Sequence, residues 1–215
     1  AEELGAQDTD LVLSFNSILL DLCISGTTEN IFSHLNIPYC SYLLDHPAYH
    51  LQRLNHVYNS LTVACVDASH VPFVEKVFSH KAFYLPHAAC SVKEEEIPLL
   101  ERPMKIFFAG TYVDPLVHLK TFKNLGPDMQ DVLGCILERA EHLPADPLMD
   151  IILEEMQAYV EDEGWSEIDY CDSVFSPLDR FIRCSRRIKV LDVLTRAGIE
   201  VVLCGEGWGK SPFAR

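Results

Sequence analysis

Apolar residues are grouped along this chain in short continuous runs, separated by turn residues and by stretches with helical spacing. In the first part of the chain, segments 31–35 and 69–78 have the apolar spacing of helices. Runs rich in β-branched and aromatic residues predict strands at 11–15, 37–44, 61–67 and 81–89. Strands that alternate with helices over short connections are typical of βαβ units. We therefore expect an α/β fold with a parallel sheet, as in one half of a doubly wound domain.

The second part of the chain shows the same pattern with a helical segment inserted. Strands are predicted at 104–112 and 199–205, and the region 115–187 has mainly helical spacing, with breaks near Pro144, Gly164 and Pro177. A helix is predicted directly before Gly198, which would be its C-cap. The run at 199–205 suits a central strand that is buried on both faces. Because both strands end in glycine and polar residues, they indicate one sheet with one ligand edge.

A change of composition predicts the domain boundary. The charged, proline-containing stretch SVKEEEIPLLER, at 91–102, is typical of a linker. We expect an N-terminal Rossmann-like domain at 1–102 and the start of a C-terminal Rossmann-like domain at 103–215. With 215 residues, of which 48% are hydrophobic, the chain can bury a sizeable core.

Charge and cysteine usage exclude several classes of protein. A formal net charge of −15 argues against a general nucleic-acid or anionic-membrane surface, since both require clustered Lys and Arg. The chain has neither a long apolar run nor the features of a signal peptide, and its cysteines are scattered, so we expect a soluble, cytoplasmic protein. Neither CxxC nor HExxH occurs, so no metal is expected.

Polar residues follow the predicted strands of the first part. Asp45 and His46 come directly after the second strand, where a carboxylate or an imidazole can serve as general base toward a hydroxyl. The alternative is that Asp45 caps the next helical turn and His46 fills the loop. After the third strand, Ser69 is expected to N-cap a helix. His87, after the fourth strand, contacts either a ligand or the other domain.

Glycines follow both strands of the second part. Gly110 and Thr111 end the first of them, and the run GEGWGK, at 205–210, follows the other. Glycine permits positive φ and lets the backbone approach a phosphate or a sugar closely. The spacing matches neither the Walker A loop nor the dinucleotide fingerprint. The run is therefore either a ligand loop or a simple turn.

The order of these segments resembles bacterial GT-B glycosyltransferases, specifically the spore-maturation-protein-like group. The segments that carry the resemblance are VDASHVPFVEKVFSHKAFYLPHAA, MKIFFAGTY and RRIKVLDVLTRAGIEVVLCGEGW, together with a D-x-P turn at 45–47. The resemblance implies two Rossmann-like domains in a GT-B-like arrangement. It also implies transfer of a sugar from a nucleotide-sugar to an acceptor hydroxyl in the cleft between them, without a cofactor or a required metal.

The resemblance also assigns roles to residues. Asp45, His46 and His87 become catalytic candidates on the acceptor side. The candidate donor contacts are Gly110, Thr111, Gly205, Glu206, Gly207 and Lys210. Because GT-B enzymes continue beyond the G-x-G-W strand, the resemblance further implies that this chain is a fragment that is inactive alone.

Two other classes of protein remain open from the sequence. The first is a non-catalytic Rossmann-like module that binds a nucleotide, a sugar or a protein partner through the same edge. The second is an oxidoreductase that uses a dinucleotide. The sequence leaves open the donor sugar, the acceptor, the stereochemistry and the oligomeric state, a homo-oligomer included.

Overall fold

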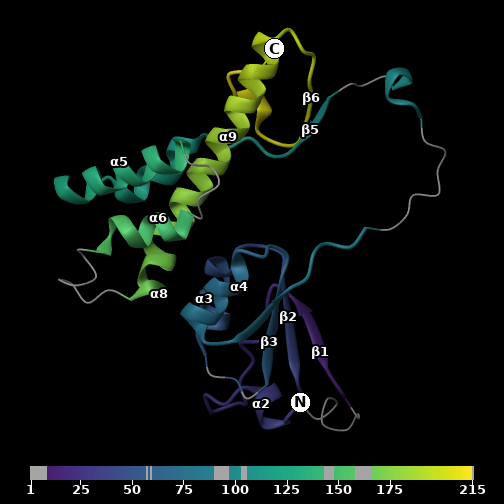
Figure 1. Ribbon diagram of the computed structural model, residues 1–215, viewed down its shortest axis with the longest axis vertical. Coiled ribbons are helices and arrows are strands. Elements are labelled where there is room, and N and C mark those ends of the chain that lie inside the picture. Colours follow the sequence, from purple (N-terminus) through teal and green to yellow (C-terminus); the bar gives the residue numbers. More distant parts are fainter. Residues whose placement is uncertain are drawn as a thin grey trace. The chain divides into compact units, whose positions relative to one another are not determined.

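The computed structural model describes residues 9–56, 58, 60–89, 97–102, 106–142, 148–157 and 166–214. The chain divides into two compact units (Figure 1). The first comprises Ala1–Ala89 with Val160–Asp172, and the second comprises Cys90–Tyr159 with Ser173–Arg215. The sequence placed the boundary after residue 102, whereas the first unit ends at Ala89 and includes a later segment. The fold is mixed α/β with parallel sheets, and is compatible with the Rossmann-like class.

The first unit is built around a parallel sheet with the strand order β1-β2-β3-β4. Its strands are β1 (Val12–Phe15), β2 (Tyr39–Leu43), β3 (Leu61–Cys65) and β4 (Lys81–Tyr84). The helices between them are α2 (Ile31–His34), α3 (Leu51–Leu54) after a 3₁₀ turn at Pro47–His50, and α4 (His70–Phe73) before a π-helical turn at Val74–Phe78. Each predicted strand is present, but the apolar runs of β2, β3 and β4 extend beyond the paired residues.

The two faces of this sheet differ in burial. On one face, the side chains of Tyr39, Leu43 and Val63 are buried in the core. On the other face, Leu13 is 61% and Phe15 is 53% exposed. Right-handed connections that always step in the same direction place their helices on one face, which explains this asymmetry. A doubly wound sheet reverses its strand order, and the described sheet contains no such reversal, so that part of the predicted fold is absent from the described residues.

The second unit has a parallel two-stranded sheet and a group of helices. β5 (Phe107–Ala109) pairs with β6 (Val202–Cys204). Along the chain between them, this unit contains a 3₁₀ helix at Pro115–Phe122, α5 (Pro127–His142), α6 (Leu148–Glu155) and α9 (Ser176–Arg196). α8 (Glu167–Tyr170) and the start of a π-helical turn at Cys171–Phe175 also lie between β5 and β6 in sequence, but they belong to the later segment of the first unit. The predicted helical insertion is thus confirmed. Pro177 lies in the first turn of α9, where the missing N–H is tolerated, so the break predicted there is the start of this helix. The breaks predicted near Pro144 and Gly164 lie outside the described residues.

The second strand of this sheet differs from the prediction. The run at 199–205 was expected to form a central strand buried on both faces, but only Val202–Cys204 pair, and both Val202 and Cys204 are exposed. The apolar core of the second unit lies instead among its helices, where Ile136, Ile152 and Leu178 are fully buried. The apolar run predicted the strand correctly. It did not predict that this strand pairs with one neighbouring strand, β5, in the described sheet.

Two half-buried histidines of the first unit predict how its stability depends on pH. Burial lowers the pKa of His50 and of His80 below the ordinary 6.5, because the charged imidazolium is poorly solvated there. His80 Nε2 also contacts the carbonyl oxygen of Leu54 at 2.7 Å. Below pH 6.5 the unfolded chain therefore binds more protons than the folded chain. The stabilisation is complete above that pH and decreases as the pH falls toward the folded pKa values.

We expect the free energy of unfolding of the first unit, measured by urea denaturation, to fall as the pH is lowered from 7.5 to 5.5. Each histidine contributes up to about 1.4 kcal/mol per pH unit to this decrease. His80→Gln keeps a donor toward Leu54 but does not titrate, so it should reduce this slope. A midpoint that stays constant or rises on acidification would contradict the assignment.

Candidate functional site

The carboxyl ends of parallel strands meet at one edge of a sheet, which is where open α/β sheets bind ligands. At this edge of the first sheet, two imidazoles from neighbouring loops come together. The rings of His46, after β2, and His70, at the start of α4, have centroids 4.7 Å apart in an edge-to-face arrangement. The ring of Phe73 lies 4.9 Å from His46 on the same cluster. The sequence predicted His46 after a strand, but not its contact with His70.

The hydrogen bond made by His46 fixes what its ring can offer a ligand. The backbone N–H of Ala48 donates to His46 Nδ1 at 3.2 Å and so caps the 3₁₀ turn that begins at Pro47. With Nδ1 accepting, the neutral ring carries its proton on Nε2, which then acts as a donor. The alternative that Asp45 caps this turn is wrong, because His46 is the capping residue.

Asp45 is the exposed carboxylate of this edge. Its Oδ2 accepts a hydrogen bond from Asn16 Nδ2 at 3.2 Å. Asn16 directly follows β1, so it lies at the same edge, and the sequence reasoning missed it. Its place at the end of a predicted strand was the signal that could have identified it. The arrangement leaves Asp45 as the proton acceptor at this edge and His46 as a donor.

A second carboxylate, Asp67, follows β3. Its Oδ1 accepts from the backbone N–H of Ser69 at 2.9 Å and from Ser69 Oγ at 2.8 Å. These two hydrogen bonds lower the pKa of Asp67, and the nearby His70 and His46 add smaller effects in the same direction. Asp67 therefore stays ionised beside the two imidazoles. Ser69 is the N-cap residue of α4, as predicted, but its side chain makes no capping hydrogen bond to the helix, because its hydroxyl donates to Asp67.

His87 is the third residue predicted for this edge. It lies exposed in the segment that follows β4. Tyr42 Oη donates to the carbonyl oxygen of Pro86 at 3.1 Å and attaches this segment to β2. Among the contacts described for this edge, none joins His87 to Asp45 or His46. The structure thus pairs His46 with His70 and Asp45 with Asn16, and no contact described at this edge places His87 in either pair.

In the second unit, the glycines after β5 and β6 lie against each other's chain segments. The backbone N–H of Gly110 donates to the carbonyl oxygen of Cys204 at 2.9 Å, and that of Tyr112 donates to Glu206 at 2.9 Å. A Cβ on Gly205, whose φ is +132°, would collide with the carbonyl oxygen of Gly110. A Cβ on Gly207, whose φ is +82°, would collide with the carbonyl oxygen of Tyr112. The close approach of two chain segments therefore explains both glycines.

We call residues 110–112 and 204–210 the crest. Trp208 packs over these residues. Its indole N–H donates to the carbonyl oxygen of Gly110 at 2.7 Å, and its ring packs against Phe108 and Tyr112. Arg187 of α9 donates to the carbonyl oxygen of Thr111 at 3.4 Å. The backbone N–H of Gly110 is already bonded, and the exposed cationic side chains available to an anionic ligand here are Lys210 and Arg187.

A hollow of about 630 Å³ also lies in the second unit. It is bounded by the end of α9, by the residues that enter β6 and by Pro212 and Phe213. Gly198 and Glu200 line it on the amino side of β6, whereas the predicted donor contacts follow the strand. The volume is that of a small-molecule pocket, but none of the six predicted donor contacts lines it.

Over the part of the chain that the structure describes, no three His, Cys, Asp or Glu side chains gather in a way that could hold a metal ion. Within the same residues, every helix is too short or too polar to cross a membrane. Comparison of the chain with protein-family models, with curated proteins and with solved structures finds no match. Fold and site therefore define the class only as a mixed α/β protein with parallel sheets.

Proposed function

We propose that this chain takes part in transferring a sugar from a nucleotide-sugar to an acceptor hydroxyl. The observation that carries the proposal is that two polar pairs lie at the carboxyl edge of the first sheet, His46 against His70 and Asn16 against Asp45. An exposed carboxylate that accepts a hydrogen bond from Asn16 can take a proton from an acceptor hydroxyl. A GT-B-like pairing of two Rossmann-like units and a cytoplasmic location belong to the same proposal.

The reaction needs one proton acceptor and one site for a leaving anion. Asp45 takes the hydroxyl proton while the acceptor oxygen forms a bond to the anomeric carbon. The bond from that carbon to the diphosphate oxygen breaks, and the nucleoside diphosphate leaves with the electron pair. The candidate cations for that diphosphate are the exposed Lys210 of the crest and the exposed Arg187 of α9, which donates to Thr111 of the crest.

One observation favours the alternative, a non-catalytic nucleotide-binding or sugar-binding module. The crest is occupied by its own chain, since Gly110 and Tyr112 use their backbone N–H groups in pairing and Trp208 packs over them. A ligand there would rely on side chains rather than on a ring of free amides.

A panel of nucleotide-sugars and dinucleotides, followed by thermal unfolding, tests the proposal. We expect nucleotide-sugars to raise the melting temperature, since a ligand at about 100 times its Kd adds about 2.7 kcal/mol. Lys210→Glu replaces a cation near the diphosphate by an anion and should weaken binding at least about tenfold. The matched control is Lys123→Glu, an exposed lysine of the same unit outside the crest.

Each outcome of the panel separates the classes. A shift with nucleotide-sugars that Lys210→Glu abolishes and Lys123→Glu retains supports a nucleotide-sugar site at the crest. Release of nucleoside diphosphate in the presence of an acceptor then separates the transferase from a non-catalytic binding module. A shift with dinucleotides only would indicate an oxidoreductase. No shift with any nucleotide would refute the proposal.

A further inference from the structure

The turn after β1 has an unusual backbone. Asn16, Ser17 and Leu19 have φ values of +51°, +56° and +69°, although none of them is glycine. Left-handed backbone is unfavourable for residues with a Cβ and persists only where the surroundings impose it. Strained backbone of this kind is concentrated at functional sites, and this turn lies at the carboxyl edge of the sheet.

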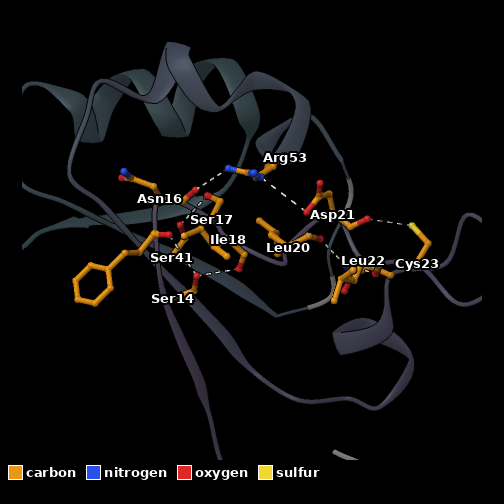
Figure 2. Close-up of polar contacts among 12 residues, drawn as sticks. Ser14, Asn16, Ser17, Ile18, Leu20, Asp21, Leu22, Cys23, Ser41 and Arg53 are labelled. Carbon is orange, nitrogen blue, oxygen red and sulfur yellow. Dashed lines mark hydrogen bonds and ion pairs between the residues drawn. The ribbon is translucent and has the colours of Figure 1, made fainter.

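Side chains from several elements hold the turn in place (Figure 2). Ser14 Oγ donates to the carbonyl oxygen of Ile18 at 2.8 Å, and Ser17 shares a buried hydroxyl contact of 2.7 Å with Ser41 of β2. Arg53 of α3 donates to the carbonyl oxygen of Asn16 at 3.2 Å and lies 3.8 Å from a carboxylate oxygen of Asp21. The carbonyl groups of the turn are therefore fixed from both sides.

Further contacts extend this support. Tyr39 Oη donates to the carbonyl oxygen of Ile18 at 2.5 Å. Asn30, the N-cap of α2, donates to the carbonyl oxygens of Leu20 and Leu22 at 2.5 and 3.2 Å. The turn thus receives hydrogen bonds from β1, β2, α3 and the start of α2, which explains how its left-handed residues are maintained.

Because the backbone of Asn16 is left-handed, its side-chain oxygen accepts a ladder hydrogen bond that a backbone oxygen normally accepts. The N–H of Asn16 donates to the carbonyl oxygen of Tyr42 at 2.9 Å, as the parallel ladder requires. In a regular ladder the carbonyl oxygen of Asn16 would then accept from the N–H of Leu44. That oxygen instead accepts from Arg53, and Asn16 Oδ1 accepts from Leu44 at 2.7 Å.

Because the side-chain oxygen of Asn16 replaces its backbone oxygen in the ladder, the orientation of the Asn16 amide group is fixed. Because Oδ1 is bound to Leu44, the Nδ2 group is directed to Asp45, where it donates to Oδ2 at 3.2 Å. Glycine would suit the backbone, but it could make neither contact. Asparagine tolerates left-handed φ and has both an acceptor and a donor.

We propose that Asn16 is a positioning residue for Asp45. The amide holds one carboxylate oxygen and leaves the other, Oδ1, for the proton of the acceptor hydroxyl. The role in transfer rests on the proposed function, whereas the restraint on Asp45 does not. Asn16 therefore acts through Asp45.

Asn16→Asp is the sharpest test. Aspartate tolerates the same backbone and keeps an acceptor for Leu44, but it has no donor and places a like charge beside Asp45. Labelling of Asp45 by a water-soluble carbodiimide, located by mass spectrometry, should rise about fivefold when the hydrogen bond is lost. Release of nucleoside diphosphate from a nucleotide-sugar should show kcat at least about tenfold lower, with KM within about twofold.

Leu19→Gly is the matched control. It changes another left-handed residue of the same turn, whose side chain is exposed, and keeps the Asn16 amide. We expect both readouts to stay within about twofold of the parent. If Asn16→Asp leaves the labelling of Asp45 unchanged, or if Leu19→Gly raises it equally, the proposal is overturned. If the parent releases no nucleoside diphosphate, the proposed function fails, and the labelling contrast alone decides whether Asn16 positions Asp45.

Discussion

A Gly205→Ala variant is expected to lose the pairing of β5 with β6. The added Cβ would overlap the carbonyl oxygen of Gly110, which is backbone and cannot rotate away, and the φ of +132° is unfavourable for any residue with a side chain. Strain of this kind and overpacking each cost about 1–3 kcal/mol. We therefore expect the second unit to be destabilised by about 3 kcal/mol or more.

Urea unfolding followed by tryptophan fluorescence measures this effect, because Trp208 packs over the same residues. Gly209→Ala is the matched control, since it changes a neighbouring glycine around which a Cβ would find open space. The free energy of unfolding of this control should stay within about 0.5 kcal/mol of that of the parent. Equal midpoints for the two variants would show that the close approach at Gly205 is not a determinant of stability.

The second large effect is expected at Asp45. Asp45→Asn keeps an oxygen that can accept from Asn16, but an amide cannot take a proton at neutral pH. General base catalysis contributes about 10²–10⁴-fold, so we expect release of nucleoside diphosphate from a nucleotide-sugar to fall by that factor. Because Asp45 is exposed, the melting temperature should change little.

Asp10→Asn is the control for this prediction, because Asp10 is an exposed aspartate of the first unit that precedes β1. It should retain the parent kcat. If Asp45→Asn also retains it within about twofold, the base lies elsewhere, and the Nε2 atom of His46 becomes the group to test. Such a result would require His46 to give up the hydrogen bond from Ala48.

The positions of the strands could be predicted from the sequence because strand formation follows local apolar runs. Each predicted run contains a strand, from β1 at Val12–Phe15 to β6 at Val202–Cys204. The ends differ where long-range pairing stops. β4 ends at Tyr84, and the N–H of Leu85 still donates to the carbonyl oxygen of Cys65, whereas the predicted run continues to residue 89.

Helix caps were predicted less well, since several neighbouring side chains can satisfy the same backbone N–H. At the turn that begins at Pro47 the sequence favoured Asp45, whereas the structure uses His46. At α4, Ser69 is the N-cap residue as expected, but its hydroxyl donates to Asp67 and makes no capping bond to the helix. These residues lie within two positions of each other along the chain. Small differences in backbone angle therefore decide which oxygen or nitrogen accepts.

At the crest, the sequence predicts a close approach to the backbone, and the tertiary structure decides what approaches it. Glycine at 205 and 207 indicates that another group lies close to the backbone. A phosphate, a sugar and another chain segment would each require glycine there, so the sequence does not distinguish them. The fold supplies the carbonyl oxygens of Gly110 and Tyr112 at these positions. A donor ligand at the crest remains a prediction that concerns Lys210 and Arg187 rather than the amide of Gly110.

The sequence by itself determined the α/β class, the positions of the strands and the polar residues that follow them, because these depend on neighbours within a few positions. Only the tertiary structure decided the strand order, the contact between His46 and His70, and the link from Asn16 to Asp45. The physical reason is register. Asn16 and Asp45 are far apart along the chain, and they meet only because β1 and β2 pair in parallel with Phe15 opposite Tyr42.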